Sequence, residues 1–283
     1  RQEHAILMGT GEEMRALREE VNEHGHYHLK FVSSVSLDNI EDIDFQNEIV
    51  KRIYSENISS IVIDLRHEKA ELILPSLYNL IFSKVRFLDM HKVYEEVFER
   101  IPLSLVKYNW FLENISSSSH MGYDLLKRIM DVLIGGALMI LSLPFYPLVA
   151  LAIKLDDHGP VFITQDRVGK NNIVMKIFKF RSMASDGTGA LFVTRTGKFL
   201  RTTRIDELPQ LWNLIRGELS LVGPRPELPD LVKVYEKEIP YYNVRHLIKP
   251  GLSGLAQIYH DQHSHHEVAT EETKNKLSYD LYY

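Results

Sequence analysis

Two adjacent carboxylates, Asp206 and Glu207, come shortly before Pro209. In the segment 210–216 that follows, the apolar residues recur at the spacing typical of a helix. The fixed φ of proline suits the first turn of a helix, so the pair is expected at a helix N-terminus. There the helix dipole favours ionised carboxylates, and free backbone N–H groups can hold a phosphate. Because adjacent residues do not share a helix face, one carboxylate can meet a substrate while the other holds a divalent cation.

Basic residues accompany this acidic pair. Between Arg167 and Arg204 there are nine Lys or Arg residues and one acid, Asp186, a balance that attracts phosphate-bearing ligands or an anionic membrane. With Arg204 and a magnesium ion neutralising phosphate oxygens and a carboxylate left as nucleophile, the set suits phosphoryl transfer. The alternatives are a solvated basic face and an acidic turn that only caps a surface helix; the acidic pair alone favours that cap.

Arg225 lies between Pro224 and Pro226, so its backbone is restricted on both sides. A guanidinium presented from a stiff loop suits bidentate recognition of a phosphate. A rigid turn with an exposed arginine explains the same three residues equally well.

An uncharged apolar run of 22 residues, 132–153, precedes these motifs and is long enough for a helix to span a bilayer. Pro144 and Pro147 fall in its middle, where each is expected to remove a helical hydrogen bond and to kink the helix. The run has basic residues on both sides, so the positive-inside rule gives no orientation. We therefore expect a re-entrant membrane hairpin over about 124–155 that enters and leaves on one face; the alternative is a buried helix hairpin.

The elements before this run predict a separate α/β unit. Short apolar runs at 4–8, 30–36, 61–65 and 85–90 alternate with polar helical stretches, which is typical of a parallel sheet. A Gly9-Thr10-Gly11 turn follows the first run, but a methionine replaces the third glycine of a dinucleotide motif. Glu12 and Glu13 would repel a phosphate there, so we expect a Rossmann-like accessory domain with a regulatory or oligomerisation role.

The amino-acid composition limits the class of protein and the chemistry that it can use. The 283 residues are 45% hydrophobic and 25% charged, which is ordinary for a globular protein of two domains. The absence of cysteine excludes disulfides, cysteine-ligated metals and thiolate catalysis. Residues 1–120 carry 13 basic and 20 acidic side chains, while 121–283 carry 20 and 18. A serine-rich linker at 109–120 divides the chain into predicted domains 1–115 and 116–283. No nucleic-acid partner is expected.

Taken together, the residues from about 123 to 283 resemble the bacterial sugar transferase family, the monotopic polyprenol-phosphate phosphoglycosyltransferases. The resemblance rests on the proline-broken apolar run and on four motifs in one order: KFRSM (179–183), DELPQ (206–210), GPRPE (223–227) and the final YDLYY (279–283). It implies a mainly helical α+β catalytic domain and a re-entrant hairpin. The preceding α/β unit is similar to the extra domain of the larger members, so we expect the sequence to be part of a longer chain.

The resemblance also implies a reaction. Asp206 would attack the β-phosphate of a UDP-sugar and release UMP, and polyprenol phosphate would then take the phosphosugar from the enzyme. Glu207, with Asp206, would hold Mg²⁺. Phosphate contacts are expected from four cations and a supporting polar role from one acid, namely Lys179, Arg181, Arg204, Arg225 and Glu227. The implied location is the cytoplasmic face of the bacterial inner membrane, and a homodimer would suit a chain with an accessory domain.

Two other functions remain open on the sequence. A membrane-associated Mg²⁺-dependent phosphatase or nucleotidyl hydrolase would use similar groups but would not need the apolar run. A non-catalytic membrane scaffold would leave DELPQ and GPRPE without a purpose.

Two stretches, 184–193 and 260–275, are shorter than the family pattern, which puts activity in doubt if they are true deletions. The histidine-rich segment 260–266 matches no metal spacing, and we favour a solvated loop.

Overall fold

The structure is a computed structural model that describes residues 2–80, 83, 85–103, 106, 110–111, 121–185, 191–260 and 268–283. Contacts divide the chain into a first unit of residues 1–112 and a second unit that contains 113–281 and Tyr283. The predicted domain boundary at 115/116 and residues 109 and 112–120 of the predicted linker lie outside the described residues.

The first unit is built on a four-stranded parallel sheet with the strand order β2-β1-β3-β4. The strands are β1 (Glu3–Gly9), β2 (Leu29–Ser36), β3 (Ser60–Ile63) and β4 (Arg86–Asp89), which confirms the four strands expected from the apolar runs. All four residues of β3 are buried, because a central parallel strand is covered on both faces.

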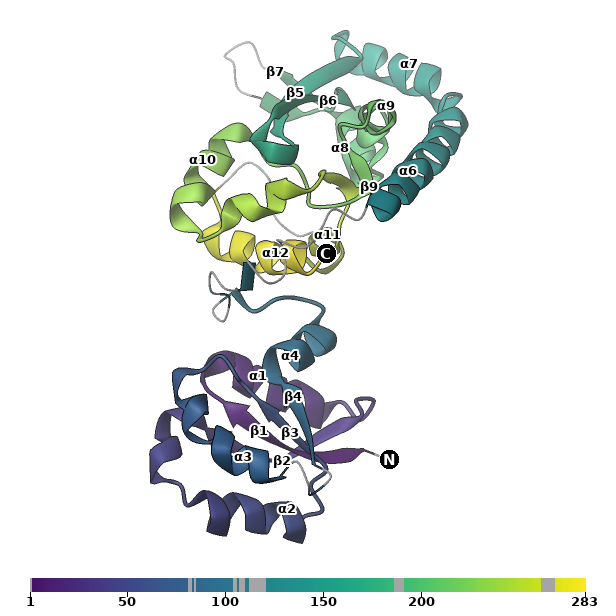
Figure 1. Ribbon diagram of the computed structural model, residues 1–283. Helices are drawn as coiled ribbons and strands as arrows, with labels where there is room; N and C mark the ends of the chain where they lie inside the picture. The colour runs from purple at the N-terminus through teal and green to yellow at the C-terminus, as the bar shows by residue number, and fades with distance from the viewer. Residues whose placement is uncertain are drawn as a thin grey trace. The chain divides into compact units, whose positions relative to one another are not determined.

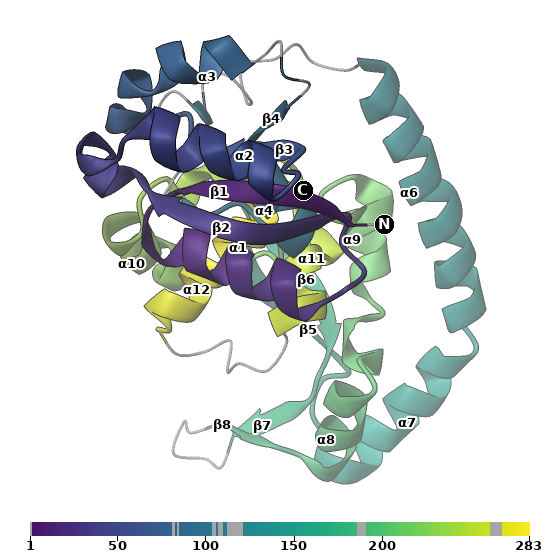
Figure 2. The same ribbon diagram turned by 90° about the horizontal axis from the view of Figure 1, so that it is seen from below.

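Helices cover both faces of this sheet, as Figure 2 shows. Helices α1 (Gly11–Glu23) and α4 (Met90–Phe98) pack on one face, and α2 (Lys51–Ser55) and α3 (Leu74–Leu80) pack on the other. Successive strand residues alternate between the two resulting cores: Leu7 faces Leu17 of α1, whereas Ile6 lies in the cluster with Leu77 of α3. Short 3₁₀ segments at 37–42 and 68–72 and a π-helical segment at 45–50 complete the unit.

A bent helix pair begins the described part of the second unit (Figure 1). Helix α6 (Met121–Ser142) and helix α7 (Phe145–Asp157) meet at an angle of 56°. Within the described residues, neither helix alone meets the length and hydropathy expected of a membrane span, and only the bent pair together does. The break falls at Pro144, the residue immediately before α7, as the sequence predicted.

Pro147 does not add a second kink. It lies in the first turn of α7, where backbone N–H groups have no partner within the helix, so a proline removes no helical hydrogen bond there. The expectation that both prolines interrupt the apolar run is therefore wrong for Pro147. Together the two prolines end one helix and begin the next.

The rest of the second unit combines three two-stranded sheets with short helices, the α+β arrangement that was expected. The antiparallel pair β5 (Phe162–Val168) and β6 (Val174–Phe180) is the longest, and β7 (Met183–Ser185) pairs with β8 (Leu191–Val193). Parallel β9 (Ser220–Val222) and β10 (Gly251–Ser253) form the third sheet. The helices are α8 (Arg195–Thr202), α9 (Gln210–Arg216), α10 (Pro229–Glu238), α11 (Leu255–His260) and α12 (Thr270–Tyr282), with single turns at 170–172, 205–207 and 242–247.

Helix α9 is held in place from both sides. A Cβ atom on Gly135 of α6 would lie 2.3 Å from a methyl group of Leu214, so a larger residue at this position would force the fully buried Leu214 side chain to move. Arg128 donates hydrogen bonds of 2.8 and 2.6 Å to the carbonyls of Leu214 and Ile215 in the last turn of α9. The Leu214 carbonyl also accepts a 2.9 Å hydrogen bond from the Gly217 amide. On the other side, the fully buried amide of Asn213 bonds the backbone of β6.

Candidate active site

The acidic pair lies in a single 3₁₀ turn, Ile205–Glu207, that leads directly into α9 through Pro209. The predicted position at a helix start is therefore confirmed, with the carboxylates one turn ahead of the α-helical residues. Arg204 precedes the turn with φ = 58°, a left-handed conformation that reverses the chain between α8 and the pair. The turn buries Asp206, which is 7% exposed.

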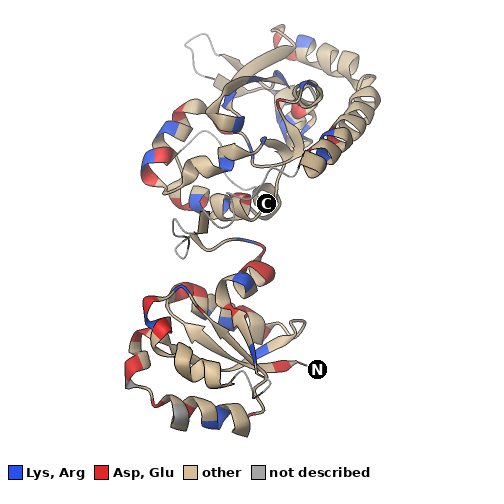
Figure 3. Cartoon of the chain, in the orientation of Figure 1, with Lys and Arg blue, Asp and Glu red and all other residues tan. Residues whose placement is uncertain are grey.

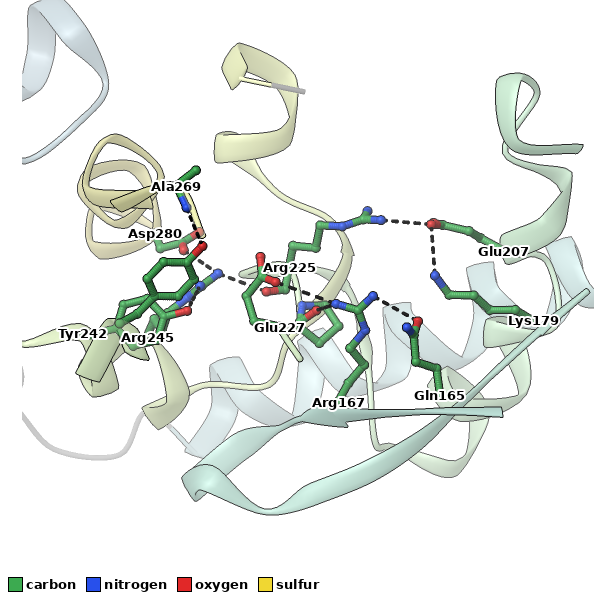
Figure 4. A network of polar contacts seen from close by, with 12 residues as sticks. Gln165, Arg167, Lys179, Glu207, Arg225, Glu227, Tyr242, Arg245, Ala269 and Asp280 are labelled. Atoms are coloured by element: carbon green, nitrogen blue, oxygen red, sulfur yellow. Dashed lines mark hydrogen bonds and ion pairs between the residues drawn. The ribbon is translucent and has the colours of Figure 1, made fainter. Parts of the chain in front are cut away.

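Three cations converge on one oxygen of Glu207, and Figure 4 shows two of them, Arg225 and Lys179. The Arg225 guanidinium donates to Glu207 Oε1 at 3.0 Å, and Lys179 Nζ and an Arg204 nitrogen lie 3.7 and 3.8 Å from the same atom. Burial acts to raise the pKa of Glu207, but Arg225 and Lys179 outweigh it and lower the pKa. Glu207 is therefore ionised at neutral pH and gathers side chains from β6, from the end of α8 and from the Pro224–Pro226 loop.

Asp206 has the opposite environment. Its Oδ1 atom is buried and has no hydrogen-bond partner among the described residues. Burial, followed by repulsion from Glu207, raises the pKa of Asp206 against the attraction of Lys179 and Arg201. Two neighbouring carboxylates with shifts in opposite directions are typical of a site where one group reacts and the other organises charge.

Lys179 links the two carboxylates. It lies near the end of β6 with a side chain that is 15% exposed, and its pKa is lowered to about 8. Burial is the largest cause, and repulsion from Arg167 and Arg225 acts in the same direction, while Glu207 acts to raise the pKa. A nearly desolvated ammonium among guanidinium groups gains most from an added anion, so this geometry favours the entry of a phosphate.

The loop that carries Arg225 is fixed by its backbone. The Arg225 carbonyl accepts a 2.9 Å hydrogen bond from Arg245, and the Pro226 carbonyl accepts one of 3.2 Å from Arg167. Arg245 is 4% exposed and forms a 2.8 Å ion pair with Asp280 of α12. These contacts confirm a stiff loop and show that the stiffness depends on long-range bonds as well as on the prolines.

Glu207 and the three cations around it, Lys179, Arg204 and Arg225, form a charged cluster. Glu227 lies beside this cluster rather than in it. Its carboxylate is 3.7 Å from a nitrogen of Arg167, and both side chains are buried. The Glu227 carbonyl also accepts a 2.9 Å hydrogen bond from the Val168 amide, which joins the loop to β5. The supporting polar role expected for Glu227 stays a prediction.

Arg181 is the predicted phosphate ligand that the structure does not bring to the cluster. Its guanidinium pairs with Asp157 at the end of α7, at 3.0 Å, and donates to the Met183 carbonyl. It also lies so close to Gly159 that a Cβ there would be 1.5 Å from one of its nitrogens. Lys179 and Arg181 are two apart in sequence, but the chain leaves β6 after Phe180 and turns Arg181 toward the bent helices.

Sequence reasoning missed Arg167 and Arg245 as parts of the site. Arg167 lies in the basic stretch but is buried, 4% exposed, and hydrogen-bonded to Gln165, where a surface cation was expected. Arg245 bonds the nearby Tyr242 hydroxyl, but the partners that connect it to the site, Arg225 and Asp280, lie 20 and 35 residues away and give no local signal.

Two cavities adjoin the acidic pair and differ in character. The smaller one is polar and is lined by Arg167, Lys179, Glu207 and Arg225 among others. The larger one has a volume of about 480 Å³ and runs from Arg204 and Glu207 to the bend of the helix pair. Its walls are mostly apolar side chains, namely Leu138, Leu141, Phe145, Ile205, Leu208, Leu211 and Leu252.

A metal site made wholly of protein ligands is not present among the described residues, where no three acidic or histidine side chains form a suitable group. The donor set fits Mg²⁺ in another way, because this ion usually takes one or two carboxylates and completes its shell with water and substrate phosphates. The unpartnered Oδ1 of Asp206 and the ionised Glu207 offer two such oxygens. The histidine-rich segment beyond His260 lies outside the described residues.

Comparison with known proteins identifies the family of the chain. The model of the bacterial sugar transferase family matches residues 122–283, more than half of the chain, and the protein belongs to this family. A UDP-N-acetylgalactosamine-undecaprenyl-phosphate N-acetylgalactosaminephosphotransferase of Aeromonas hydrophila is 42% identical over 170 residues, which are 57% of this chain and 39% of that protein.

Two further relatives are also similar to part of the chain. A UDP-glucose:undecaprenyl-phosphate glucose-1-phosphate transferase of Klebsiella pneumoniae is 36% identical over 56% of this chain and 35% of its own length. An exopolysaccharide production protein of Rhizobium leguminosarum is 41% identical over 47% of this chain and 73% of its own length. The matched part of the chain thus spans about two fifths or less of the longer relatives.

Proposed function

We propose that the protein transfers a sugar 1-phosphate from a UDP-sugar to a polyprenol phosphate such as undecaprenyl phosphate. The observation that carries the proposal is the pairing of an unpartnered, buried Asp206 with a neighbouring Glu207 that gathers three cations. This is the charge arrangement that a diphosphate needs beside a nucleophile. The names of the relatives support the same reaction class.

The reaction proceeds in two displacements. A carboxylate oxygen of Asp206 attacks the β-phosphorus of the UDP-sugar, the bond from that phosphorus to the bridging oxygen breaks, and UMP leaves with the electron pair. The phosphosugar remains on Asp206 as an acyl phosphate. A phosphate oxygen of the polyprenol phosphate then attacks the same phosphorus, which frees the Asp206 carboxylate and gives polyprenol diphosphosugar.

The cations around Glu207 have separate tasks in this scheme. Lys179 and Arg225 hold the phosphate oxygens and balance the charge that grows on the leaving UMP. Arg204 lies at the border between the acidic pair and the apolar cavity, where it can meet the phosphate of the acceptor. Glu207, with Asp206, would hold Mg²⁺, which supplies further neutralisation of the diphosphate when bound.

The apolar cavity suits the acceptor lipid. It joins the acidic pair to the bend at Pro144, so a polyprenol chain can lie along the helix pair with its phosphate at Arg204. Large apolar side chains along the pair are widely exposed, for example Leu133 at 67%, Leu141 at 68% and Leu148 at 65%. A re-entrant hairpin at the cytoplasmic face of a bacterial inner membrane would cover them. The N-terminal unit then serves as a Rossmann-like accessory domain, suited to forming a homodimer.

Release of UMP tests the proposal. The protein in detergent micelles with Mg²⁺ should release UMP from a UDP-sugar at a sustained rate only when polyprenol phosphate is added. Without the lipid, release should stop after one equivalent per enzyme, because Asp206 is then occupied. Sustained hydrolysis without lipid would instead identify a phosphatase or nucleotidyl hydrolase, and no release at all would support a scaffold.

A further inference from the structure

A second charged cavity lies at the start of α6, away from the acidic pair. Its volume is about 300 Å³, and it shares no lining residue with the two cavities of the candidate active site. Four cations, two carboxylates and two tyrosines contribute to its wall: Lys127, Arg128, Lys170, Lys249, Asp124, Asp131, Tyr123 and Tyr283.

The cations of this cavity are only partly neutralised. Asp131 is buried and already accepts hydrogen bonds from Ser220 Oγ at 2.8 Å and from the Leu221 amide at 3.0 Å. By contrast, the ammonium group of neither Lys170 nor Lys249 has a hydrogen bond or an ion pair with any residue in the described part of the chain. The cavity therefore holds two ammonium groups that form no ion pair with either carboxylate of its wall.

The surroundings of Lys249 give the cavity a positive potential at this residue. Burial lowers its pKa first, and repulsion from Arg128 and Lys170 lowers it further, against weaker attraction from Asp131 and Asp124. An anion bound between Lys170 and Lys249 would relieve this repulsion.

Helix α6 places this cavity next to a lipid-facing surface. Its charged residues 124, 127, 128 and 131 recur at helical spacing on one face, and all four line the cavity. The neighbouring residues Leu125, Leu126, Ile129 and Met130 are between 46% and 62% exposed. Figure 3 shows the same division along the helix, with charged positions near its start and uncharged ones beyond.

The geometry points to a binding site for the phosphate of an anionic phospholipid, with Lys170 and Lys249 as its cationic ligands. The acyl chains would lie along the exposed apolar residues of α6, so this inference rests on the membrane location in the proposed function. Basic pockets beside membrane helices on the cytoplasmic side bind anionic lipid headgroups in this way. Tyr123, 61% exposed, and Tyr283 are the amphipathic aromatic residues typical of the headgroup level.

The charge of Lys127 supports an anion site in this cavity. Its ammonium group lies 5.0 Å from the centre of the Tyr283 ring and donates a 3.0 Å hydrogen bond to the Val222 carbonyl. Lys127 is thereby held at the wall of the cavity, where it adds positive potential without moving. The ammonium groups of Lys170 and Lys249 would then bind the phosphate of the headgroup.

Calorimetric titration of the full chain in a non-ionic detergent tests the site. The probes are dihexanoylphosphatidylglycerol, dihexanoylphosphatidylcholine and inorganic phosphate. We expect the anionic lipid to bind and the zwitterionic lipid to bind at least tenfold more weakly. The double variant K170Q/K249Q should bind the anionic lipid about thirtyfold more weakly, because each lysine near a membrane surface contributes roughly a fivefold gain.

The double variant K233Q/K237Q is the matched control. It removes two exposed lysines from α10, outside the cavity, and should change lipid affinity less than twofold. An equal loss in both variants, or no loss in K170Q/K249Q, overturns the site. Inorganic phosphate binding as tightly as the anionic lipid overturns the lipid assignment and identifies a site for free phosphate.

UMP release by the same wild-type preparation separates this inference from the proposed function. A preparation that binds the lipid through Lys170 and Lys249 but releases no UMP contradicts the function and leaves the lipid site standing. A preparation that releases UMP but binds the lipid equally in all variants contradicts the site alone.

Discussion

Arg225 donates a 3.0 Å hydrogen bond to Glu207, and its own carbonyl accepts one of 2.9 Å from the buried Arg245. The acidic pair thus holds the side chain of Arg225, while the core of the second unit holds its backbone. A diphosphate that enters between Arg225 and Lys179 meets a guanidinium whose position is already set. Little ordering is then needed when the substrate binds.

Replacing Arg225 with lysine should therefore lower kcat/KM for UMP release by about ten- to a hundredfold. The ammonium keeps the charge but cannot reproduce the planar fork, and a charge-assisted hydrogen bond is worth about 1.5–3 kcal/mol. Steady-state kinetics with a UDP-sugar will measure the change. Arg216→Lys, at an exposed pair on the end of α9, is the control and should stay within twofold. Unchanged kinetics in Arg225→Lys would reduce Arg225 to a structural residue of the loop.

Asp206→Asn should abolish turnover, with a loss of about 10⁴-fold or more, because the amide keeps the size of the side chain but is not a nucleophile. Glu207→Gln should leave a slower enzyme that needs more Mg²⁺, since a neutral amide is a weaker ligand for a hard cation.

Mass spectrometry distinguishes the two roles. Enzyme mixed with UDP-sugar and no lipid acceptor should carry a phosphosugar on the peptide that contains Asp206, and Asp206→Asn should carry none. An active preparation that never shows this adduct would mean direct transfer, with both carboxylates serving only the metal.

The pKa shifts predict a bell-shaped dependence of kcat/KM on pH. Asp206 must be ionised to attack, so activity falls as the pH drops through its pKa, which burial raises above the ordinary value near 3.9. Lys179 must be charged to hold a phosphate, so activity also falls as the pH rises through about 8. In Lys179→Arg the alkaline limb should move beyond pH 10, because arginine stays charged. An alkaline limb that stays near 8 in this variant would assign it to another group.

The buried pair of Arg245 and Asp280 should matter for stability as well as for the loop. The two side chains are 3% and 2% exposed, and removing one partner of such a pair leaves a buried charge at a cost of about 3–5 kcal/mol. Asp280→Asn should therefore lower the melting temperature of the second unit by about 10 °C in calorimetry. Asp230→Asn is the control, because its pair with Lys233 is exposed and should contribute less than 1 kcal/mol. Equal melting temperatures in the two variants would show that the buried pair contributes no more than an exposed one.

Local patterns in the sequence were enough to predict the parallel strands, the break at Pro144 and the helix that follows Asp206 and Glu207. Each depends on residues within one or two turns of one another, where periodicity and proline geometry act directly. The family resemblance added the roles of the two carboxylates, which their spacing alone left open.

Features that depend on distant contacts were not predictable in this way. Arg181 belongs to the same motif as Lys179, yet it pairs with Asp157 because the strand ends between them. The Arg225 carbonyl is held by Arg245, which lies in the 3₁₀ segment at 242–247 and in turn pairs with Asp280 of α12. Nothing near position 225 indicates these contacts. The second charged cavity likewise combines residues from 123 to 283, which only the folded chain brings together.

A re-entrant arrangement of α6 and α7 predicts that both outer ends of the pair lie on one side of the membrane. The chain has no cysteine, so single cysteines can report on each position separately. Gly122→Cys and His158→Cys, both at exposed positions, should react with a charged maleimide in inside-out vesicles and not in right-side-out vesicles. Leu143→Cys, 52% exposed in the structure, should react in neither until detergent removes the lipid. Labelling of residues 122 and 158 from opposite sides would mean that the bent pair crosses the bilayer, and efficient labelling of residue 143 without detergent would mean that the pair lies outside it.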